Sequence, residues 1–289
     1  MSASHVTVRR FIAIHLAAAT LAAAAPLAHA GFDQFSEGGT TLGSSIQDTI
    51  DAFRAAIGGA NNANAAGPIV GGRREINWDG AAATMASNVG TPFTGFQNSR
   101  GGTFTTPGTG FTQSPLGDAA LTGIQASYAT TFSVFSAQRI FTPLGSNITE
   151  VTFAIPGTGG ATPATASAFG AVFSDVDLAN TTTIEFFNLA NATIHLLNVL
   201  PGLDGAAEAP TLSFAGAVAN AGERIARVRI TTGDGALGPV DTNGNPDDLV
   251  VMDDFIYAEP IAVPEPTSAV LATAGAILLA GVRRRQRQS

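Results

Sequence analysis

The chain has 289 residues with a formal net charge of −8, and its hydrophobic fraction of 45% can supply the core of one large domain or two small ones. It contains no cysteine, which excludes disulfides, thiolate zinc sites and cysteine nucleophiles. All 14 basic residues are arginine, so Schiff-base chemistry and phosphate-binding loops that need a lysine are excluded as well.

The first 30 residues have the three parts of a secretory signal peptide. The positively charged pair Arg9-Arg10 is followed by a long apolar run that carries no formal charge. Ala28 and Ala30 then occupy the small-residue positions of a cleavage site, so we expect the mature chain to begin at Gly31. The alternative is a buried alanine-rich helix.

The segment after the signal peptide predicts one short N-terminal amphipathic helix. Ser45 followed by Asp48 resembles a capping box, and Gly58-Gly59 ends the segment. The apolar residues between these signals recur at helical spacing, at Ile46, Ile50, Phe53 and Ile57. We expect this helix to pack against the domain.

The rest of the mature region predicts a mainly β fold. Residues 73–80 are typical of a strand that ends in a turn, and residues 81–127 of short strands joined by long loops. Further strands are predicted at residues 130–136, 148–155, 169–176, 182–187, 193–199, 211–218, 225–231 and 249–257. So many short strands without long helices favour an antiparallel β-sandwich, and we expect a jelly-roll-like topology. In the last strand, alternation predicts that Val251 and its neighbours of like parity share one buried face.

The C-terminus predicts a transmembrane helix. Val263, Pro264, Glu265 and Pro266 precede an apolar run at residues 267–282, and a cluster of arginines follows. Sixteen helical residues span about 24 Å, somewhat less than a hydrocarbon core of about 30 Å. The arginines would hold their end on the cytoplasmic side of the membrane. The alternative is a soluble terminal helix.

This order of a Val-Pro-Glu-Pro motif, a short apolar segment and terminal arginines resembles the PEP-CTERM protein-sorting signal of Gram-negative bacteria. The resemblance covers residues 263–287 and implies that the tail holds an exported precursor in the inner membrane until an exosortase-type enzyme processes it. The strand segments at 169–177, 183–187, 225–230 and 252–257 are also similar to sandwich domains attached to such tails, which resemble carbohydrate-binding jelly rolls.

The sequence thus divides into a signal peptide at 1–30, an exported domain at 31–260 and a sorting tail at 261–289. Without the two sorting segments, eight arginines oppose 21 carboxylates, because Glu265 lies in the tail; this leaves a formal charge of −13 and excludes nonspecific binding of nucleic acid. The resemblance implies an export route and, by association, an exopolysaccharide-producing surface. We therefore predict an exported, non-enzymatic cell-surface or extracellular-matrix protein associated with exopolysaccharide. The alternatives are a lectin-like carbohydrate-binding module and an extracellular glycoside hydrolase.

Catalytic candidates are few, and we predict no catalytic residue. Cleavage of the signal peptide leaves His195 as the one histidine, and no Gly-x-Ser-x-Gly motif accompanies it. Glycoside hydrolysis needs two carboxyl groups at a set separation, which the sequence does not establish. The candidates on or near predicted strands are Glu150, Asp175, Glu185 and Glu223.

Two kinds of ligand site remain. Trp78 followed by Asp79 could contact a sugar ring, with a buried anchor as the alternative. Oxygen side chains at alternate positions, as in calcium loops, occur at Asp241, Asn243, Asn245 and Asp247. The loop departs from an EF-hand at its sixth and last ligand positions, so an Asp/Asn-rich turn is the alternative. A further oxygen cluster would form if the strand ends that carry Asp175, Asp177, Asp253 and Asp254 meet.

A structural calcium ion is the one cofactor that the sequence predicts, because oxygen ligands without cysteine disfavour zinc and copper. Calcium at a hundredfold excess over its dissociation constant should stabilise the protein by about 2.7 kcal/mol, measured as a rise in melting temperature. The double variant Asp241→Ala, Asp247→Ala should lose that gain and melt normally without calcium. If neither calcium nor chelator moves the wild-type transition, the loop is only a turn.

Overall fold

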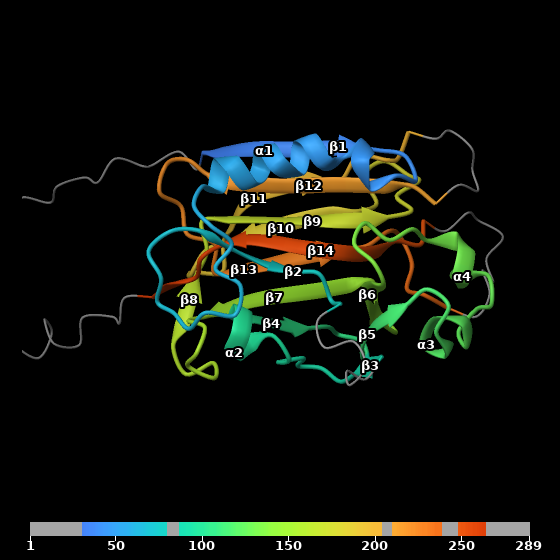
Figure 1. Cartoon of the computed structure of the whole chain (residues 1–289), viewed down its shortest axis with the longest axis horizontal. Coiled ribbons are helices and arrows are strands. Elements are labelled where there is room, and N and C mark those ends of the chain that lie inside the picture. Colours follow the sequence, from blue (N-terminus) through green and yellow to red (C-terminus); the bar gives the residue numbers. More distant parts are fainter. Residues whose placement is uncertain (1–30, 80–86, 204–209, 239–247, 264–289) are drawn as a thin grey trace, which may run out of the picture.

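The computed structural model describes residues 31–79, 87–203, 210–238 and 248–263, and within these ranges fifteen strands form two antiparallel sheets (Figure 1). Sheet A contains, in spatial order, β1 (Phe32–Gly38), β12 (Leu212–Ala219), β9 (Ala168–Ser174), β14 (Val251–Ala258), β6 (Arg139–Leu144), β5 (Gly110–Pro115) and β3 (Asn88–Val89), and β2 (Arg73–Ile76) also pairs with β14. Sheet B contains β11 (Thr193–Asn198), β10 (Thr183–Phe187), β13 (Arg227–Thr231), β7 (Ile148–Ala154), β8 (Pro163–Thr165) and β15 (Ile261–Ala262), and β4 (Gly102–Thr105) also pairs with β7.

The two sheets pack face to face on an aromatic core, which confirms the prediction of a mainly β, antiparallel sandwich. Phe153 of sheet B lies 6.5 Å from Phe169 of sheet A, measured between ring centroids. Phe104 of sheet B lies 5.9 Å from Phe255 of sheet A. One continuous cluster of buried apolar residues joins the facing sides of both sheets, as alternation of apolar residues along each strand requires.

The outer face of sheet A carries helix α1 (Gln47–Ile57), which contacts β1, β12 and β14. Phe53 of this helix is fully buried and lies flat over two glycines of sheet A. A Cβ added at Gly170 or Gly216 would approach the Phe53 ring to 3.0 or 2.9 Å, so the close approach of helix and sheet requires glycine at both positions.

The start of α1 differs from the predicted capping box. Ser45 lies in a short 3-10 helix, η1 (Gly43–Ser45), where its hydroxyl accepts from the backbone N–H of Thr40 and donates to the carbonyl of Leu42. The cap residue of α1 is Ile46, which makes no side-chain cap bond. Asp48 still lies in the first turn, where a negative charge interacts favourably with the helix dipole.

Strand β14, near the middle of sheet A, contains a β-bulge. Met252 lies opposite Phe173, whereas Phe255 lies opposite Ala171, so β14 has one residue more than β9 between these points. The extra residue falls at Asp253-Asp254. The bulge interrupts the alternation of side chains along a strand whose residues are all buried.

The bulge overturns the expectation that Val251 shares one face with its neighbours of like parity. Met252 before the bulge and Phe255 and Tyr257 after it all belong to the core between the sheets. Val251 and Ile256 belong to clusters on the outer side of sheet A. All eight residues of β14 are buried, because both faces of this strand are covered.

The predicted strand at residues 130–136 is wrong. Residues Tyr128–Thr131 form a short helix, α4, and no strand follows before β6. The backbone N–H groups of Ser133, Phe135 and Ser136 donate to side chains of Ser174 and Asp253 instead of to a neighbouring strand. Two further short helices, α2 (Gln97–Arg100) and α3 (Ala119–Thr122), lie in the region predicted as strands and loops.

The predicted signal peptide and the predicted transmembrane helix at residues 267–282 lie outside the described residues. Of the described helices, none has both the length and the apolar character to cross a membrane. The strands continue slightly beyond the expected domain end at residue 260, because β15 pairs with β8.

A buried ion pair joins β2 to the residue that follows β14. Arg74 of β2 donates to both carboxylate oxygens of Glu259, at 2.6 and 2.7 Å, and both side chains are almost completely buried. Arg74 also donates to the carbonyls of Ala63 and Ala65, so its charge holds the loop before β2 in place.

Glu259→Gln should destabilise the protein strongly, because it leaves the guanidinium of Arg74 buried without a counter-charge. Loss of one partner of a buried pair typically costs about 3–5 kcal/mol. The matched control is Asp51→Asn, which removes a carboxylate from an exposed pair with Arg54 and should cost less than about 1 kcal/mol. Unfolding in urea measures both; equal losses in the two variants would contradict the assignment.

Candidate functional site

Three aspartates converge on the hydroxyl group of Ser136. Asp253 and Asp254 come from the bulge of β14, and Asp79 comes from the segment after β2. The Ser136 Oγ lies 2.7 Å from an oxygen of Asp254, 3.3 Å from one of Asp79 and 3.4 Å from one of Asp253. We call these four residues the Ser136 cluster. A hydroxyl has one proton, so it donates to one carboxylate at a time, and its shortest contact is with Asp254.

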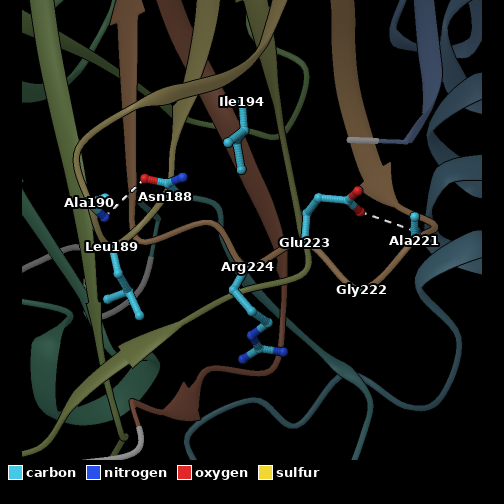
Figure 2. A pocket seen from close by; sticks show the side chains of 8 residues that line it. All are labelled: Asn188, Leu189, Ala190, Ile194, Ala221, Gly222, Glu223 and Arg224. Atoms are coloured by element: carbon cyan, nitrogen blue, oxygen red, sulfur yellow. Dashed lines mark hydrogen bonds between the residues drawn. The ribbon is translucent and has the colours of Figure 1, made fainter. Parts of the chain in front are cut away.

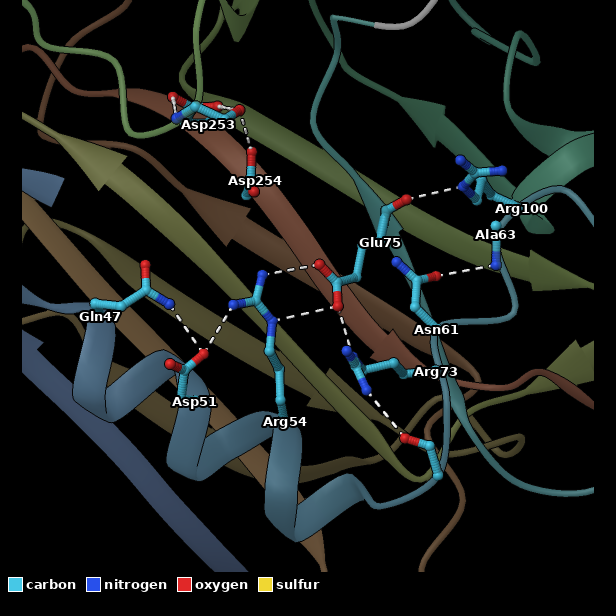
Figure 3. A network of polar contacts seen from close by, with 12 residues as sticks. Gln47, Asp51, Arg54, Asn61, Ala63, Arg73, Glu75, Arg100, Asp253 and Asp254 are labelled. Carbon is cyan, nitrogen blue, oxygen red and sulfur yellow. Dashed lines mark hydrogen bonds and ion pairs between the residues drawn. The ribbon is translucent and has the colours of Figure 1, made fainter. Parts of the chain in front are cut away.

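The bulge explains why two neighbouring carboxyl groups lie together. In a regular strand, Asp253 and Asp254 would point to opposite faces of the sheet. The bulge brings their side chains within hydrogen-bond contact of each other (Figure 3). Asp253 is also anchored by the backbone, since its Oδ2 accepts from the N–H of Phe135 at 2.6 Å.

Ionisation of the carboxyl groups of Asp253 and Asp254 is disfavoured. Burial raises the pKa of Asp253 well above its usual range, and the negative charge of Asp254 raises it further. Burial also raises the pKa of Asp254, against the hydrogen bonds from Ser136 and Asp253, which lower it. Two buried carboxyl groups in contact favour a state in which they share one proton. The Ser136 cluster can therefore hold and release a proton, and the partners of its hydroxyl within the described ranges are carboxyl groups.

Of the predicted sugar-binding pair, Asp79 belongs to the Ser136 cluster, whereas Trp78 lies in the core between the sheets. Trp78 is fully buried and stacks on Phe141 at 3.8 Å between ring centroids. Its indole N–H donates to the backbone carbonyl of Asp253 at 2.7 Å. The ring has no exposed face on which a sugar could stack, which agrees with the alternative of a buried anchor. Asp79 accepts from the backbone N–H groups of Gln138 and Arg139.

A second group of aspartates lies at one end of the sandwich. Burial and then the charges of Asp177 and Asp248 raise the pKa of Asp175 to about 7. Asp248 accepts from the backbone N–H of Asp177 at 2.9 Å, and its own N–H donates to Asp234 at 2.7 Å. The four aspartates at 175, 177, 253 and 254 thus belong to two separate groups and do not form the single oxygen cluster considered from the sequence.

The predicted calcium ligands Asp241, Asn243, Asn245 and Asp247 lie outside the described residues. Asp248, which follows them directly, belongs to the group at the end of the sandwich. Within the described ranges, no three or more histidine, cysteine, aspartate or glutamate side chains are arranged to hold a metal ion.

The carboxyl groups considered for glycoside hydrolysis have separate contacts. Glu150 forms ion pairs with Arg227 and Arg229 across sheet B. Glu185 accepts from the hydroxyl of Thr193 at 2.6 Å. Glu223, on the loop before β13, accepts from the backbone N–H groups of Gly31 and Ala221.

His195 stacks on Phe32 with 4.6 Å between ring centroids, and its Nε2 is buried without a hydrogen-bond partner. Burial lowers the pKa of this histidine, which favours the neutral ring.

A surface pocket of about 470 Å³ lies between the β10–β11 turn and the loop before β13 (Figure 2). It is lined by Asn188, Leu189, Ala190, Ile194, Ala221, Gly222, Glu223 and Arg224. Its polar groups are already engaged in part: Asn188 accepts from the N–H of Ala190, and Arg224 donates to Thr165. The lining contains no aromatic side chain. Of these residues, Glu223 was a candidate from the sequence, as a carboxyl group for glycoside hydrolysis.

Comparison with models of known protein families finds no match for this chain. Comparison with curated protein sequences likewise finds no similar protein.

The Ser136 cluster predicts a pH-dependent stability. A carboxyl group whose pKa is raised by folding stabilises the fold below its unfolded value of about 3.9 and loses that contribution as pH rises through the folded value. Asp254→Asn removes one charge from the bulge while its amide oxygen can still accept from Ser136. Its free energy of unfolding should exceed that of the wild type at pH 7, and the difference should vanish near pH 3.

Urea unfolding between pH 3 and pH 8 measures this difference, and a tenfold change in the proton affinity of a carboxyl group corresponds to about 1.4 kcal/mol. The control Asp33→Asn removes a charge from an exposed carboxylate that accepts from the side-chain amide of Asn220, and it should show no such pH dependence. Parallel pH profiles for Asp254→Asn and the wild type would mean that the bulge carboxyl groups ionise freely.

Proposed function

We propose that the chain is an exported, non-enzymatic cell-surface or extracellular-matrix protein that is sorted by a PEP-CTERM tail. The observation that carries this proposal is the position of the two sorting segments relative to the fold. β1 begins at Phe32, immediately after the expected cleavage site before Gly31. β15 ends at Ala262, immediately before the Val-Pro-Glu-Pro motif. Removal of residues 1–30 and of the chain from Val263 onward would therefore leave every described strand intact.

The proposed sorting route supplies the partners. The tail would hold the precursor in the inner membrane, and an exosortase-type enzyme would process it there. The remaining acidic domain is suited to an exported protein that stays soluble through its net charge. Association with exopolysaccharide is part of the same proposal and follows from the resemblance of the tail.

We infer a jelly-roll topology for the sandwich. In support, β6, β14, β9 and β12 run in this order in sheet A, and β7, β13, β10 and β11 run in this order in sheet B. Among these eight strands, chain neighbours alternate between the sheets except at the β10–β11 hairpin. This order corresponds to two interlocked Greek keys, the arrangement that capsid and lectin domains use.

A lectin-like module is the second candidate function, and the surface pocket favours it. Its size falls within the range of small-molecule sites, and it combines apolar lining with the polar ends of Asn188, Glu223 and Arg224. Trp78 contributes nothing to such a site because it is buried. A glycan array separates the candidates: specific binding to a defined glycan would favour the lectin over a structural component.

Processing tests the proposed export. Mass spectrometry of the mature protein should find Gly31 at its N-terminus and no residues from Arg283 to Ser289. A variant with alanine at Pro264, Glu265 and Pro266 should keep its tail and remain in the membrane fraction. The matched control, Thr267→Ala with Ser268→Ala, lies just past the motif and should be processed normally. Export of a mature protein that retains either end would refute the proposal.

A further inference from the structure

The backbone nitrogen of Gly31 points at a carboxylate far away in the sequence. Its N–H donates to Oε1 of Glu223 at 2.7 Å. The other carboxylate oxygen of Glu223 accepts from the N–H of Ala221 at 3.1 Å, which fixes the orientation of the carboxylate (Figure 2). The carbonyl of Gly31 in turn accepts from the N–H of Asn220 at 3.0 Å. Gly31 is thus held from both sides by one short loop.

The position leaves little space for another residue. A Cβ added at Gly31 would lie 2.1 Å from the side-chain oxygen of Asn220. That side chain donates to Asp33 of β1 at 2.8 Å, so a larger residue at position 31 would have to displace a contact that also ties β1 to this loop. Because β1 is an edge strand that pairs only with β12, its first residues depend on such ties.

Cleavage before Gly31 changes the chemistry of this nitrogen. Hydrolysis of the Ala30–Gly31 peptide bond consumes one water, leaves a carboxyl group on Ala30 and frees the nitrogen of Gly31 as an amine. The amine takes up a proton and becomes an ammonium group. A neutral amide that donates one hydrogen bond is thereby replaced by a cation with three protons at the same place.

We infer that the ammonium group released by this cleavage forms an ion pair with Glu223, so that removal of the signal peptide fastens β1 to the loop before β13. The inference rests on the proposed export and adds a structural consequence to it. In the precursor a neutral N–H donates to the carboxylate, and cleavage adds a full positive charge to this donor, so that Coulomb attraction is added to the hydrogen bond. The mature N-terminus is therefore attached more firmly than the same residue of the precursor.

The surrounding charges favour this pairing. Asp33 on β1 adds a second negative charge near the amine, whereas Arg224 beside Glu223 opposes it while donating to Thr165. His195, which stacks on Phe32, has a lowered pKa because of burial, so it adds no charge near neutral pH. Slight burial raises the pKa of Glu223, but the N–H groups of Gly31, Glu223 and Ala221 outweigh this and lower it, so the carboxylate is ionised near neutral pH, where the amine is protonated.

The absence of lysine makes the experiment specific. The α-amine at Gly31 is the only primary amine that the processed chain contains. We would express the full precursor, purify the processed form and verify its N-terminus by sequencing. The pH dependence of labelling by an amine-reactive reagent then gives the pKa of this one group. An unpaired α-amine titrates near pH 8, and the ion pair should move this midpoint upward by about 0.5–1 on the pH scale. Less of the amine is then neutral at pH 7.5, so the labelling rate at this pH should fall by about three- to tenfold.

Glu223→Gln should return the midpoint to its unpaired value, and the control Glu185→Gln, which removes a carboxylate bound to Thr193, should leave it unchanged. Acetylation of the amine provides a second measurement. It should lower the melting temperature of the wild type at pH 6.5 and have no further effect on Glu223→Gln. Because the folded pKa of the amine is raised, the difference should persist below about pH 8 and disappear as pH rises through the folded value.

The outcomes separate this inference from the proposed function. A mature N-terminus at another residue would refute the cleavage site and with it the proposed processing. An N-terminus at Gly31 with the same labelling midpoint in wild type and Glu223→Gln would leave the export proposal intact and overturn the ion pair.

Discussion

The extra residue at Asp253-Asp254 is the constraint on which much of the sandwich depends. It lies in β14, which pairs with strands on both sides and is buried on both faces. By shifting the alternation of the strand, it directs Met252 and Phe255 to the same core although they are three residues apart. It also presents the carbonyl of Asp253 to the indole of Trp78. One irregularity therefore sets both the aromatic core and the acidic cluster next to it.

The bulge also replaces a strand by a loop. The carboxylate of Asp253 accepts hydrogen bonds from the backbone N–H groups of Phe135 and Ser136. Without this carboxylate, these N–H groups would need acceptors on a neighbouring strand. Residues 130–136 alternate between polar and apolar side chains, and this pattern predicts a strand. When a side chain supplies the acceptors that a neighbouring strand would otherwise provide, the segment does not need to form a strand. The local sequence pattern does not show that such a side chain is present.

The sequence predicts the layers of this fold better than its details. Alternating apolar residues in β7, β9 and β12 correctly indicated strands, because their periodicity reflects burial on a sheet. β1 was not expected, since its burial is weak and its partner lies far along the chain. The sequence suggested a single cluster of aspartates, whereas the structure divides them between two groups. Asp79 and Ser136 meet Asp253 only through the tertiary fold, and the one local sign of their meeting is a pair of adjacent aspartates in an apolar strand.

The pairing of β1 has a consequence for the order of events in folding. Phe32 lies opposite Ala219, and each following residue of β1 pairs with an earlier residue of β12. A chain that emerges with its N-terminus first presents β1 before any partner for it exists. The strand must stay unpaired until the chain has emerged almost as far as β13, and such late, long-range pairing is slow. The first strand of the domain to emerge is thus among the last to pair. This edge of sheet A is completed only when most of the molecule is present.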